Sequence, residues 1–241
     1  MRPPLPAIPE TPAPIRAILF DAGNTLFFER PTRFEIYTAA AKELGLAVDL
    51  ERVRRVMHEQ HERVPPADGA ARYTDAWFER YVPAVYRSLG ASDTMLVGLV
   101  ASLRDRYRRT AVIQLFPETA RVLGELRKVG IRLGIVSNWS PRLRHHLESL
   151  AITPLFDAVL ISAVEGVEKP APEIFLRACS RLGVNPNETL HVGDHRVNDV
   201  EGAERAGLRG IWIDREGRAE VAGPPAIRSL DALLPLVGAI A

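Results

Sequence analysis

The sequence is poor in several features, and each shortage narrows what the protein can be. Cys179 is the only cysteine, so no disulfide can form within the chain, and we expect a reducing, cytoplasmic setting. There is no run of about 18 apolar residues, which predicts that no segment spans a membrane. The net charge is only +1 over 241 residues, which gives no electrostatic reason to expect nucleic acid or an anionic membrane as a partner.

Lysine is also scarce, since only Lys42, Lys128 and Lys169 stand among 31 basic residues. Arginine therefore carries most of the positive charge, and each lysine is a candidate for a special role. Proline, in contrast, is concentrated at the N-terminus, which holds six of the 19 prolines in its first 14 residues and lacks the apolar region of a signal peptide. We predict a mobile, partly polyproline tail at residues 1–14.

Most of the sequence alternates short apolar runs with amphipathic segments. We predict strands at 16–20, 131–136, 157–161, 189–192 and 210–213, and helices at 118–129, 141–150, 172–182 and 198–206. Strands and helices that alternate with short links are typical of parallel β-α units. The strands are continuously apolar, as expected where helices cover both faces of a sheet.

An insert that is helical almost throughout separates the first strand from the others. We predict its helices at 33–45, 49–63, 71–88 and 93–109. Gly45 and Gly90 are typical helix stops, Asp49 and Ser92 are typical N-caps, and Pro83 is expected to kink or interrupt the third helix. The predicted fold class is α/β: a Rossmann-like parallel sheet core with helices on both faces at 15–28 and 111–241, and an inserted α-helical domain at 29–110.

Polar residues collect where the predicted strands end. Ligands of open parallel sheets bind beyond the carboxyl ends of the strands, so these residues are expected to converge on one edge. They are Asp21 after the first strand, Ser137 and Asn138 after the second, Lys169 beyond the third, and Asp194, Asn198 and Asp199 after the fourth.

This set of side chains suits attack on a phosphoryl group. A carboxylate such as Asp21 is repelled by a phosphate dianion, and a divalent cation together with Lys169 would offset that repulsion. Oxygen ligands with open positions suit Mg²⁺, which Asp21 and Asp194 would hold with Asp199 behind them. Ser137 would donate to a phosphate oxygen.

Two further features of the loop after Ser137 support this interpretation. Asn138 would also donate to the phosphate. Ser140 and Pro141 are expected to be the N-cap and first residue of a helix, whose dipole would favour an anion nearby.

The chain resembles the haloacid dehalogenase-like hydrolases, in the subgroup with a helical cap after the first motif. The matching segments follow the family's order and spacing over nearly the whole chain after the tail. They are Phe20-Asp21-Ala22-Gly23-Asn24-Thr25-Leu26, Ile135-Val136-Ser137-Asn138, Glu168-Lys169-Pro170-Ala171-Pro172-Glu173-Ile174-Phe175, and Val192-Gly193-Asp194-His195-Arg196-Val197-Asn198-Asp199-Val200-Glu201-Gly202-Ala203.

The resemblance implies a phosphatase-type hydrolase (EC 3.1.3) that acts on a small phosphorylated metabolite. Asp21 would form a covalent aspartyl intermediate that water later hydrolyses. Ser137 and Lys169 would bind the transferring group, Thr25 would support the nucleophile loop, and Asn24, Thr25 and Asn138 are further candidate substrate contacts. Mg²⁺ would lie between Asp21, Asp194 and the backbone carbonyl of Gly23, with Asp199 nearby.

Gly23 is a departure from the family's phosphatases, which usually carry a second aspartate there as general acid and base. A positioned acid–base group typically contributes about 10²–10⁴-fold in rate. Three explanations stay open. The substrate has a good leaving group, such as an acyl phosphate or diphosphate; another residue substitutes, with His195 the nearest candidate; or turnover is weak or lost and the chain is a phosphate-binding relative.

Relatives that break carbon–halogen or carbon–phosphorus bonds also lack the second aspartate. The carbon–phosphorus branch needs a lysine in the cap, and Lys42, the only one, lies on an ordinary solvated helix face. The carbon–halogen branch needs no metal, whereas Asp194 and Asp199 resemble a retained metal site. The sequence names no substrate, and it leaves monomer and homodimer open.

Overall fold

The computed structural model describes residues 14–67, 71–110, 112–217 and 223–238. Of the predicted N-terminal tail, all but Pro14 lies outside the described residues. The chain divides into two compact units, one made of Met1–Phe28 with Leu115–Ala241 and the other of Glu29–Gln114. The sequence placed the second boundary at 110/111, a few residues earlier.

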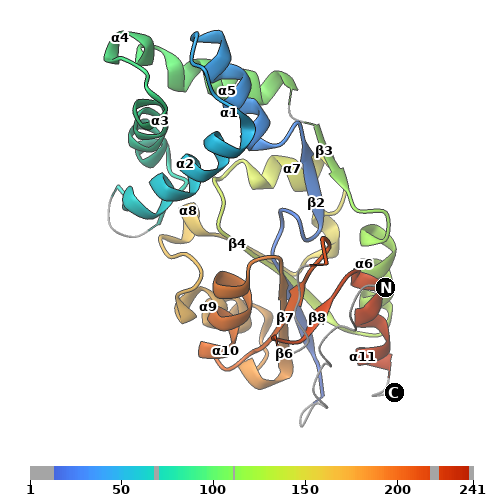
Figure 1. Cartoon of the computed structure of the whole chain (residues 1–241). Coiled ribbons are helices and arrows are strands. Elements are labelled where there is room, and N and C mark those ends of the chain that lie inside the picture. Colours follow the sequence, from blue (N-terminus) through green and yellow to red (C-terminus); the bar gives the residue numbers. More distant parts are fainter. Residues whose placement is uncertain (1–13, 68–70, 111, 218–222, 239–241) are drawn as a thin grey trace. The chain divides into compact units, whose positions relative to one another are not determined.

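The first unit is built on a six-stranded sheet in the order β5-β4-β1-β6-β7-β8, and all neighbouring strands are parallel (Figure 1). All four residues of β1 are buried, as the continuous apolar run predicts. The strands are β1 (Ala17–Phe20), β4 (Arg132–Ser137), β5 (Ala158–Ile161), β6 (Thr189–Gly193), β7 (Arg209–Ile213) and β8 (Ala226–Ile227).

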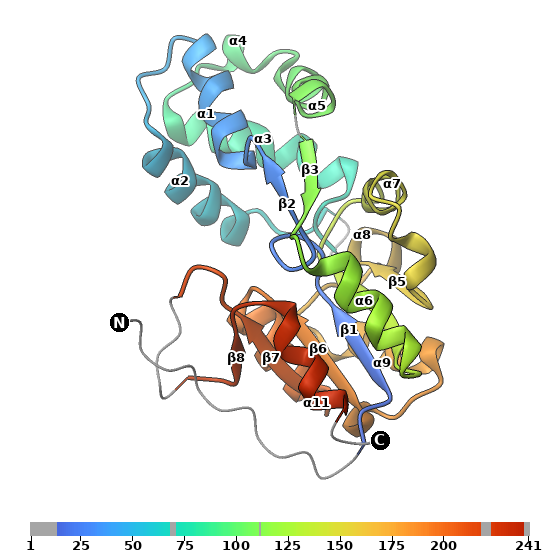
Figure 2. The same cartoon turned by 90° about the vertical axis from the view of Figure 1, so that its right-hand side faces the viewer.

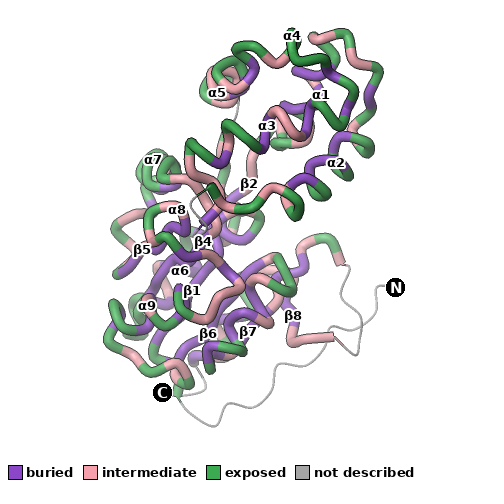
Figure 3. The backbone as a smooth tube through the Cα atoms, turned by 90° about the vertical axis from the view of Figure 1, so that its left-hand side faces the viewer, coloured by how far each residue is buried: buried purple, intermediate pink, exposed green. Residues whose placement is uncertain are grey.

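Helices cover both faces of this sheet. Ala17 and Leu19 of β1 pack in one buried cluster with Ile174 and Phe175 of α9 (Pro172–Leu182), and α10 (Gly202–Arg205) adds Ala203 to the same cluster. Figure 2 shows α6 (Thr119–Lys128) and α11 (Leu234–Gly238) together on the other face. In Figure 3 the strands of this unit are buried, while the outer helix surfaces are exposed. The predicted parallel α/β core is confirmed.

The second unit consists of helices around a core of their own. Its helices are α1 (Arg33–Glu43), α2 (Leu50–Arg63), α3 (Asp75–Leu89), α4 (Asp93–Leu96) and α5 (Leu99–Thr110). Trp77 stacks on Tyr81 with ring centroids 4.3 Å apart, and the buried hydroxyls of Tyr81 and Tyr86 donate to the backbone carbonyls of Met57 and Tyr37. The unit therefore buries its aromatic side chains and satisfies their polar ends locally.

Several predicted helix limits in this unit are wrong. The helix expected at 93–109 is two helices, because Gly98 adopts a positive φ of 73° between α4 and α5. The helix expected from residue 71 begins at Asp75, where the Thr74 side chain caps it. Pro83 does not interrupt α3, which runs unbroken from Asp75 to Leu89. Asp49 caps α2 as predicted, whereas Ser92 precedes α4 without a capping side-chain hydrogen bond.

Other elements are absent from the prediction. β2 (Phe27–Arg30) and β3 (Val112–Leu115) form a separate two-stranded sheet, and α8 (Ser162–Glu165) follows β5. The segment predicted as helix 198–206 is a π-helical turn, Arg196–Glu201, followed by α10. Within the described residues, no helix has the length and apolar character that crossing a lipid bilayer requires.

Candidate active site

Parallel strands bring the predicted residues to one edge of the sheet in the first unit. Asp21 follows β1 directly, Ser137 is the last residue of β4, and Asp194 follows β6. β1 lies between β4 and β6, so these three residues end adjacent strands. Lys169 reaches the same edge from the segment between α8 and α9.

The Asp21 carboxylate is buried, and one of its oxygens accepts two hydrogen bonds. The Ser137 hydroxyl donates to Asp21 Oδ1 at 3.0 Å, and Lys169 Nζ donates to the same atom at 2.7 Å. Burial raises the pKa of the Asp21 carboxyl, and the charge of Lys169 opposes that rise. Lys169 thus stabilises the ionised, nucleophilic form of Asp21.

Lys169 is bound equally closely by a second carboxylate. Its Nζ donates to Asp199 Oδ1 at 2.5 Å, and only 2% of each side chain is exposed. Burial lowers the pKa of Lys169, but the charges of Asp199 and Asp21 outweigh burial and raise it. The ammonium therefore stays protonated between two carboxylates.

Both carboxylate oxygens of Asp199 take part in hydrogen bonds with neighbouring groups. Its Oδ1 also contacts His191 Nε2 at 2.9 Å, and its Oδ2 accepts the backbone N–H of His195 at 2.9 Å. Burial raises the pKa of Asp199, but Lys169 and His191 outweigh it and hold the pKa well below the usual range. A Cβ at Gly193 would lie 2.1 Å from the Asp199 carboxyl carbon, so only glycine at 193 allows this approach.

Asp194 completes a cluster of three carboxylates. Asp21, Asp194 and Asp199 each offer an oxygen within 4.8 Å of the others, which is close enough for one metal ion. Burial raises the pKa of Asp194 to about 7, and the charges of Asp21 and Asp199 act in the same direction. Such crowding of like charges is relieved by a cation.

The other predicted site residues lie beside this cluster. Asn24 Nδ2 donates to Asp194 Oδ2 at 3.2 Å. The Asn138 side-chain amide donates to the Lys169 carbonyl and accepts the Lys169 backbone N–H, both at 2.8 Å. Asn138 therefore positions that lysine. Thr25 is fully buried in the nucleophile loop. Ser140 and Pro141 were wrongly predicted to open a helix, because α7 (Leu143–Ser149) begins two residues later.

Trp139, whose ring lies against Gly23, was not predicted as a residue of the site. A Cβ placed on Gly23 would lie 2.7 Å from Cζ3 and 3.2 Å from Cη2 of the Trp139 ring. The ring lies edge-on to Phe27, with centroids 5.8 Å apart. The aromatic ring therefore occupies the space that a side chain at position 23 would need. The contact joins residues far apart in sequence, and only the position of Trp139 directly after the Ser137-Asn138 motif could have drawn attention to it.

Arg215 was also missed, although it anchors the loop that follows the nucleophile. Its guanidinium donates to the carbonyls of Asn24 at 3.2 Å and Thr25 at 2.7 Å, and it pairs with Glu118 at 2.9 Å. It also stacks 3.4 Å from the centroid of the Phe116 ring. Arg215 follows β7 and belongs to none of the matching motifs.

Other reactive residues have different surroundings. Cys179 is buried, its Sγ lies 3.8 Å from Thr189 Oγ1, and burial raises its pKa, so it is no thiolate nucleophile. His61 Nε2 contacts the Tyr73 hydroxyl at 2.9 Å in the second unit. Lys42 is exposed on α1. Among the described residues, the acidic cluster is the group found to suit a metal ion.

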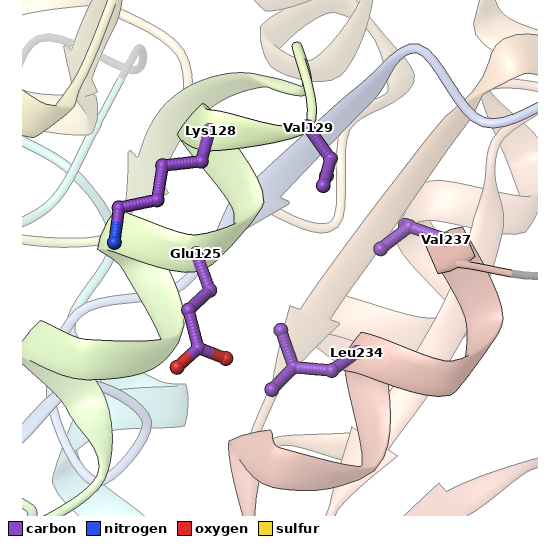
Figure 4. A pocket seen from close by; sticks show the side chains of 5 residues that line it. All are labelled: Glu125, Lys128, Val129, Leu234 and Val237. Carbon is purple, nitrogen blue, oxygen red and sulfur yellow. The ribbon is translucent and has the colours of Figure 1, made fainter. Parts of the chain in front are cut away.

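A surface hollow of about 300 Å³ lies between α6 and α11 (Figure 4). Its lining contains none of the residues of the acidic cluster. Leu234 and Val237 of α11 point toward the α6 side in that view, and they line it together with Glu125, Lys128 and Val129.

Comparison with known proteins agrees with this geometry. A family model described as haloacid dehalogenase-like hydrolase matches residues 15–207. The chain is 31% identical over 214 residues to a glyceraldehyde 3-phosphate phosphatase of Methanopyrus kandleri, covering 85% of this chain and 88% of the relative.

Two solved structures have the same fold. One is a phosphatase of this family from Thermococcus onnurineus, with a TM-score of 0.65, 27% identity and coverage of 93% of this chain and 98% of that one. The other is a 2-haloacid dehalogenase from Pseudomonas syringae, with a TM-score of 0.67, 25% identity and coverage of 94% and 100%. The chain belongs to the haloacid dehalogenase-like hydrolases, and the prediction that it is a hydrolase of this family is confirmed.

Proposed function

We propose that this protein is a Mg²⁺-dependent phosphatase of a small phosphorylated metabolite that acts through a covalent aspartyl phosphate on Asp21. The observation that carries the proposal is the pair of donors on Asp21 Oδ1, Ser137 at 3.0 Å and Lys169 at 2.7 Å. Both groups lie where they can donate to the oxygens of a phosphoryl group bonded to Asp21. Phosphatases among the curated relatives support the same reaction class.

The residues present suit Mg²⁺. The direct ligands we propose are the carboxylates of Asp21 and Asp194 and the backbone carbonyl of Gly23. Asp199 acts indirectly, because its oxygens already accept hydrogen bonds from Lys169, His191 and His195. When bound, the cation supplies positive charge that offsets the repulsion between the Asp21 carboxylate and a phosphate dianion.

The proposed reaction has two steps, both centred on Asp21. Its carboxylate oxygen bonds to phosphorus, and the leaving group departs with the electron pair of its own P–O bond. Water then bonds to the same phosphorus, and the electron pair of the bond to Asp21 returns to the carboxylate. Lys169 and Ser137 hold the transferring oxygens in both steps, and Lys169 keeps the released carboxylate ionised.

A carbon–halogen hydrolase is the second candidate, since solved dehalogenases share the fold. Three carboxylates face one lysine here, which leaves excess negative charge beside the nucleophile. Displacement of halide needs no metal, whereas a cation bound to these carboxylates would offset the repulsion of a phosphate dianion. The acidic cluster therefore favours phosphoryl transfer. The cytoplasmic setting stays a prediction from the single cysteine.

Release of orthophosphate and of halide tests these alternatives side by side. The purified protein is assayed with p-nitrophenyl phosphate, acetyl phosphate, several sugar phosphates and 2-chloropropionate, with Mg²⁺ and with EDTA. We expect phosphate release that needs Mg²⁺ and disappears in Asp21→Asn, and no chloride release. Chloride release would favour the dehalogenase. Binding of Mg²⁺ and phosphate without any turnover would favour a non-catalytic phosphate-binding protein.

A further inference from the structure

The contact between Trp139 and Gly23 bears on which substrates the active site can process. Trp139 Cζ3 would lie 2.7 Å from a Cβ on residue 23, a distance that real Cβ contacts essentially never show. Any side chain at that position, including a carboxylate that could protonate a leaving group, would therefore require the Trp139 ring to move. This contact lies wholly within the first unit and needs no assumption about the second.

Trp139 makes contacts through both its backbone and its ring. Its backbone N–H donates to the buried Ser162 hydroxyl at 3.2 Å, and its carbonyl accepts the N–H of Ala163 at 3.3 Å. The Phe27 ring packs against the Trp139 ring in an edge-on arrangement, with centroids 5.8 Å apart. These contacts hold the Trp139 backbone and leave its half-buried ring beside Gly23, packed against Phe27.

Among the described residues of the first unit, three neighbours of the nucleophile that could supply a proton in place of residue 23 make other contacts or are neutral. Asn24 donates its amide to Asp194 and does not titrate. The His195 ring accepts the backbone N–H of Asn198 at 3.2 Å and so caps its own helical turn. His146 lies with its ring 6.3 Å from that of Trp139, and burial lowers its pKa to about 4, so it is neutral near pH 7.

From this geometry we infer that the protein is selective for phosphoryl donors whose leaving groups depart without protonation. The chemical class is acyl phosphates, phosphoanhydrides and aryl phosphates, in contrast to alkyl phosphate monoesters. The inference rests on the proposed phosphatase function and adds the substrate class to it. Trp139 and Gly23 together determine that selectivity.

The first step balances without an acid. The Asp21 carboxylate and a phosphate dianion ester give the aspartyl phosphate dianion and a free leaving-group anion, with the P–O electron pair on that anion. A carboxylate, phosphate or phenolate carries this charge stably, whereas an alkoxide requires a proton. In the second step water adds to phosphorus, both its protons stay on the released phosphate, and Asp21 leaves as a carboxylate.

The decisive experiment is a leaving-group series on the unmodified protein with Mg²⁺. kcat/KM is measured for acetyl phosphate, for substituted phenyl phosphates of graded leaving-group pKa, and for glycerol 3-phosphate. We expect a steep fall in kcat/KM as the leaving-group pKa rises, with the alkyl ester at least about 100-fold below p-nitrophenyl phosphate. Equal rates across the series would overturn the inference and leave the phosphatase assignment intact.

A double variant tests the cause of the selectivity. In Gly23→Asp with Trp139→Gly, the ring is removed and a carboxylate takes its place, so the dependence on leaving-group pKa should flatten by about 100-fold across the series. Trp139→Gly alone opens the space without supplying an acid and should keep the steep dependence. A flat series for Trp139→Gly alone would contradict the role of the missing acid.

Failure of the inference and failure of the proposed function give different results. A parent protein that is inert on every phosphate tested contradicts the phosphatase assignment and this inference with it. A parent that turns over aryl and alkyl phosphates alike contradicts only the inference. If the double variant does not fold, the leaving-group series of the parent protein still tests the proposed selectivity.

Discussion

The Trp139 ring restricts which side chains can be accommodated at position 23. The ring fills the position beside the nucleophile loop, and the lack of a Cβ at residue 23 is what makes that packing possible. An added side chain at residue 23 would cause strain unless the ring moves, because the ring already fills that space. The departure from the family's usual aspartate is therefore a feature of packing as well as of chemistry.

Restoring the aspartate alone should not improve the enzyme. We predict that Gly23→Asp loses about 1–3 kcal/mol of unfolding free energy, because its Cβ meets the Trp139 ring, and that its phosphatase activity falls below that of the parent. Urea unfolding and p-nitrophenyl phosphate hydrolysis measure the two effects. Gly23→Ala is the matched control, since it adds the same Cβ without a charge and should be destabilised to a similar degree. A stable, more active Gly23→Asp would contradict this packing.

The raised pKa of Asp194 couples stability to pH and to metal. Its carboxyl has a pKa of about 7 in the folded protein and about 3.8 when unperturbed, so the folded state binds the proton more tightly. The stability linked to that proton is present below about pH 4 and is lost as pH rises through 7. Mg²⁺ replaces the proton only after the carboxyl has ionised.

We therefore predict that Mg²⁺ raises the Tm more at about pH 8 than at about pH 5.5. Thermal unfolding at both pH values, with Mg²⁺ and with EDTA, measures the difference. Asp194→Asn should remove most of the Mg²⁺ effect at both pH values. A Tm increase that is the same at the two pH values, or that survives in Asp194→Asn, would argue against Asp194 as a ligand.

The sequence predicts the polar and charged residues of the site but not Trp139 and Arg215, which pack around it. Asp21, Ser137, Lys169, Asp194 and Asp199 end predicted strands or follow them, so the parallel sheet alone predicts that they converge. Trp139 and Arg215 act through contacts between residues more than 100 positions apart. No local pattern marks such residues, because their neighbours are known only once the chain is folded.

At the scale of elements, Arg215 joins the end of β7 to the loop that follows β1. Its guanidinium binds two successive carbonyls of that loop, pairs with Glu118 and stacks on Phe116. Four contacts on one planar group restrict the backbone next to the nucleophile. Glu118 also accepts the N–H of Leu230 at 3.3 Å, so the same acid is held from a third segment.

Removal of the Arg215 side chain should impair catalysis more than stability. We predict that Arg215→Ala lowers kcat/KM about 10- to 100-fold, because a small displacement of the nucleophile loop is costly to the rate, while unfolding free energy falls by about 1–2 kcal/mol. Lysine cannot span both carbonyls, so Arg215→Lys should recover only part of the activity.

Added guanidinium provides a readout that a purely structural role would not change. It should raise the activity of Arg215→Ala at concentrations that leave the parent unaffected. Arg16→Ala is the matched control, because Arg16 is largely exposed and lies at the opposite end of β1. Normal kcat/KM in Arg215→Ala would show that the loop after the nucleophile does not need Arg215 to hold it in place.

Continuously apolar strands were predicted well, and short or exposed strands were not. The β1, β4, β6 and β7 strands are apolar runs, and their predicted limits agree with the structure to within one residue. β2 carries Glu29 and Arg30, and β8 has only two residues, so neither gives a strand pattern. Two helix limits shifted where Gly98 and Tyr73 adopt positive φ.

At the scale of the whole molecule, the chain forms two units with separate hydrophobic cores. One core lies against the parallel sheet and the other lies among α1, α2, α3 and α5. The acidic cluster belongs entirely to the first unit. Parallel topology was predictable because alternating strands and helices have few other solutions, whereas the substrate is not encoded in any such regularity.

Separate cores imply that damage to one unit can spare the other. We predict that Trp77→Ala, which removes a buried ring stacked on Tyr81, destabilises the second unit by about 3–5 kcal/mol. Calorimetry should show an earlier transition for that unit, while the remaining transition still shifts upward with Mg²⁺. Phe78→Ala, at a partly buried neighbouring position, should cost less. A single transition that no longer responds to Mg²⁺ would mean that the two units unfold together.

The central claim, that Asp21 is the nucleophile, is tested most directly by identifying the phosphorylated residue. The protein is mixed with acetyl phosphate and Mg²⁺, quenched with acid within the first turnovers, digested and analysed by mass spectrometry. We predict a phosphoryl group on Asp21, absent from Asp21→Asn and from samples with EDTA. Turnover with no phosphoryl group on Asp21, or with the group on another residue, would contradict the account.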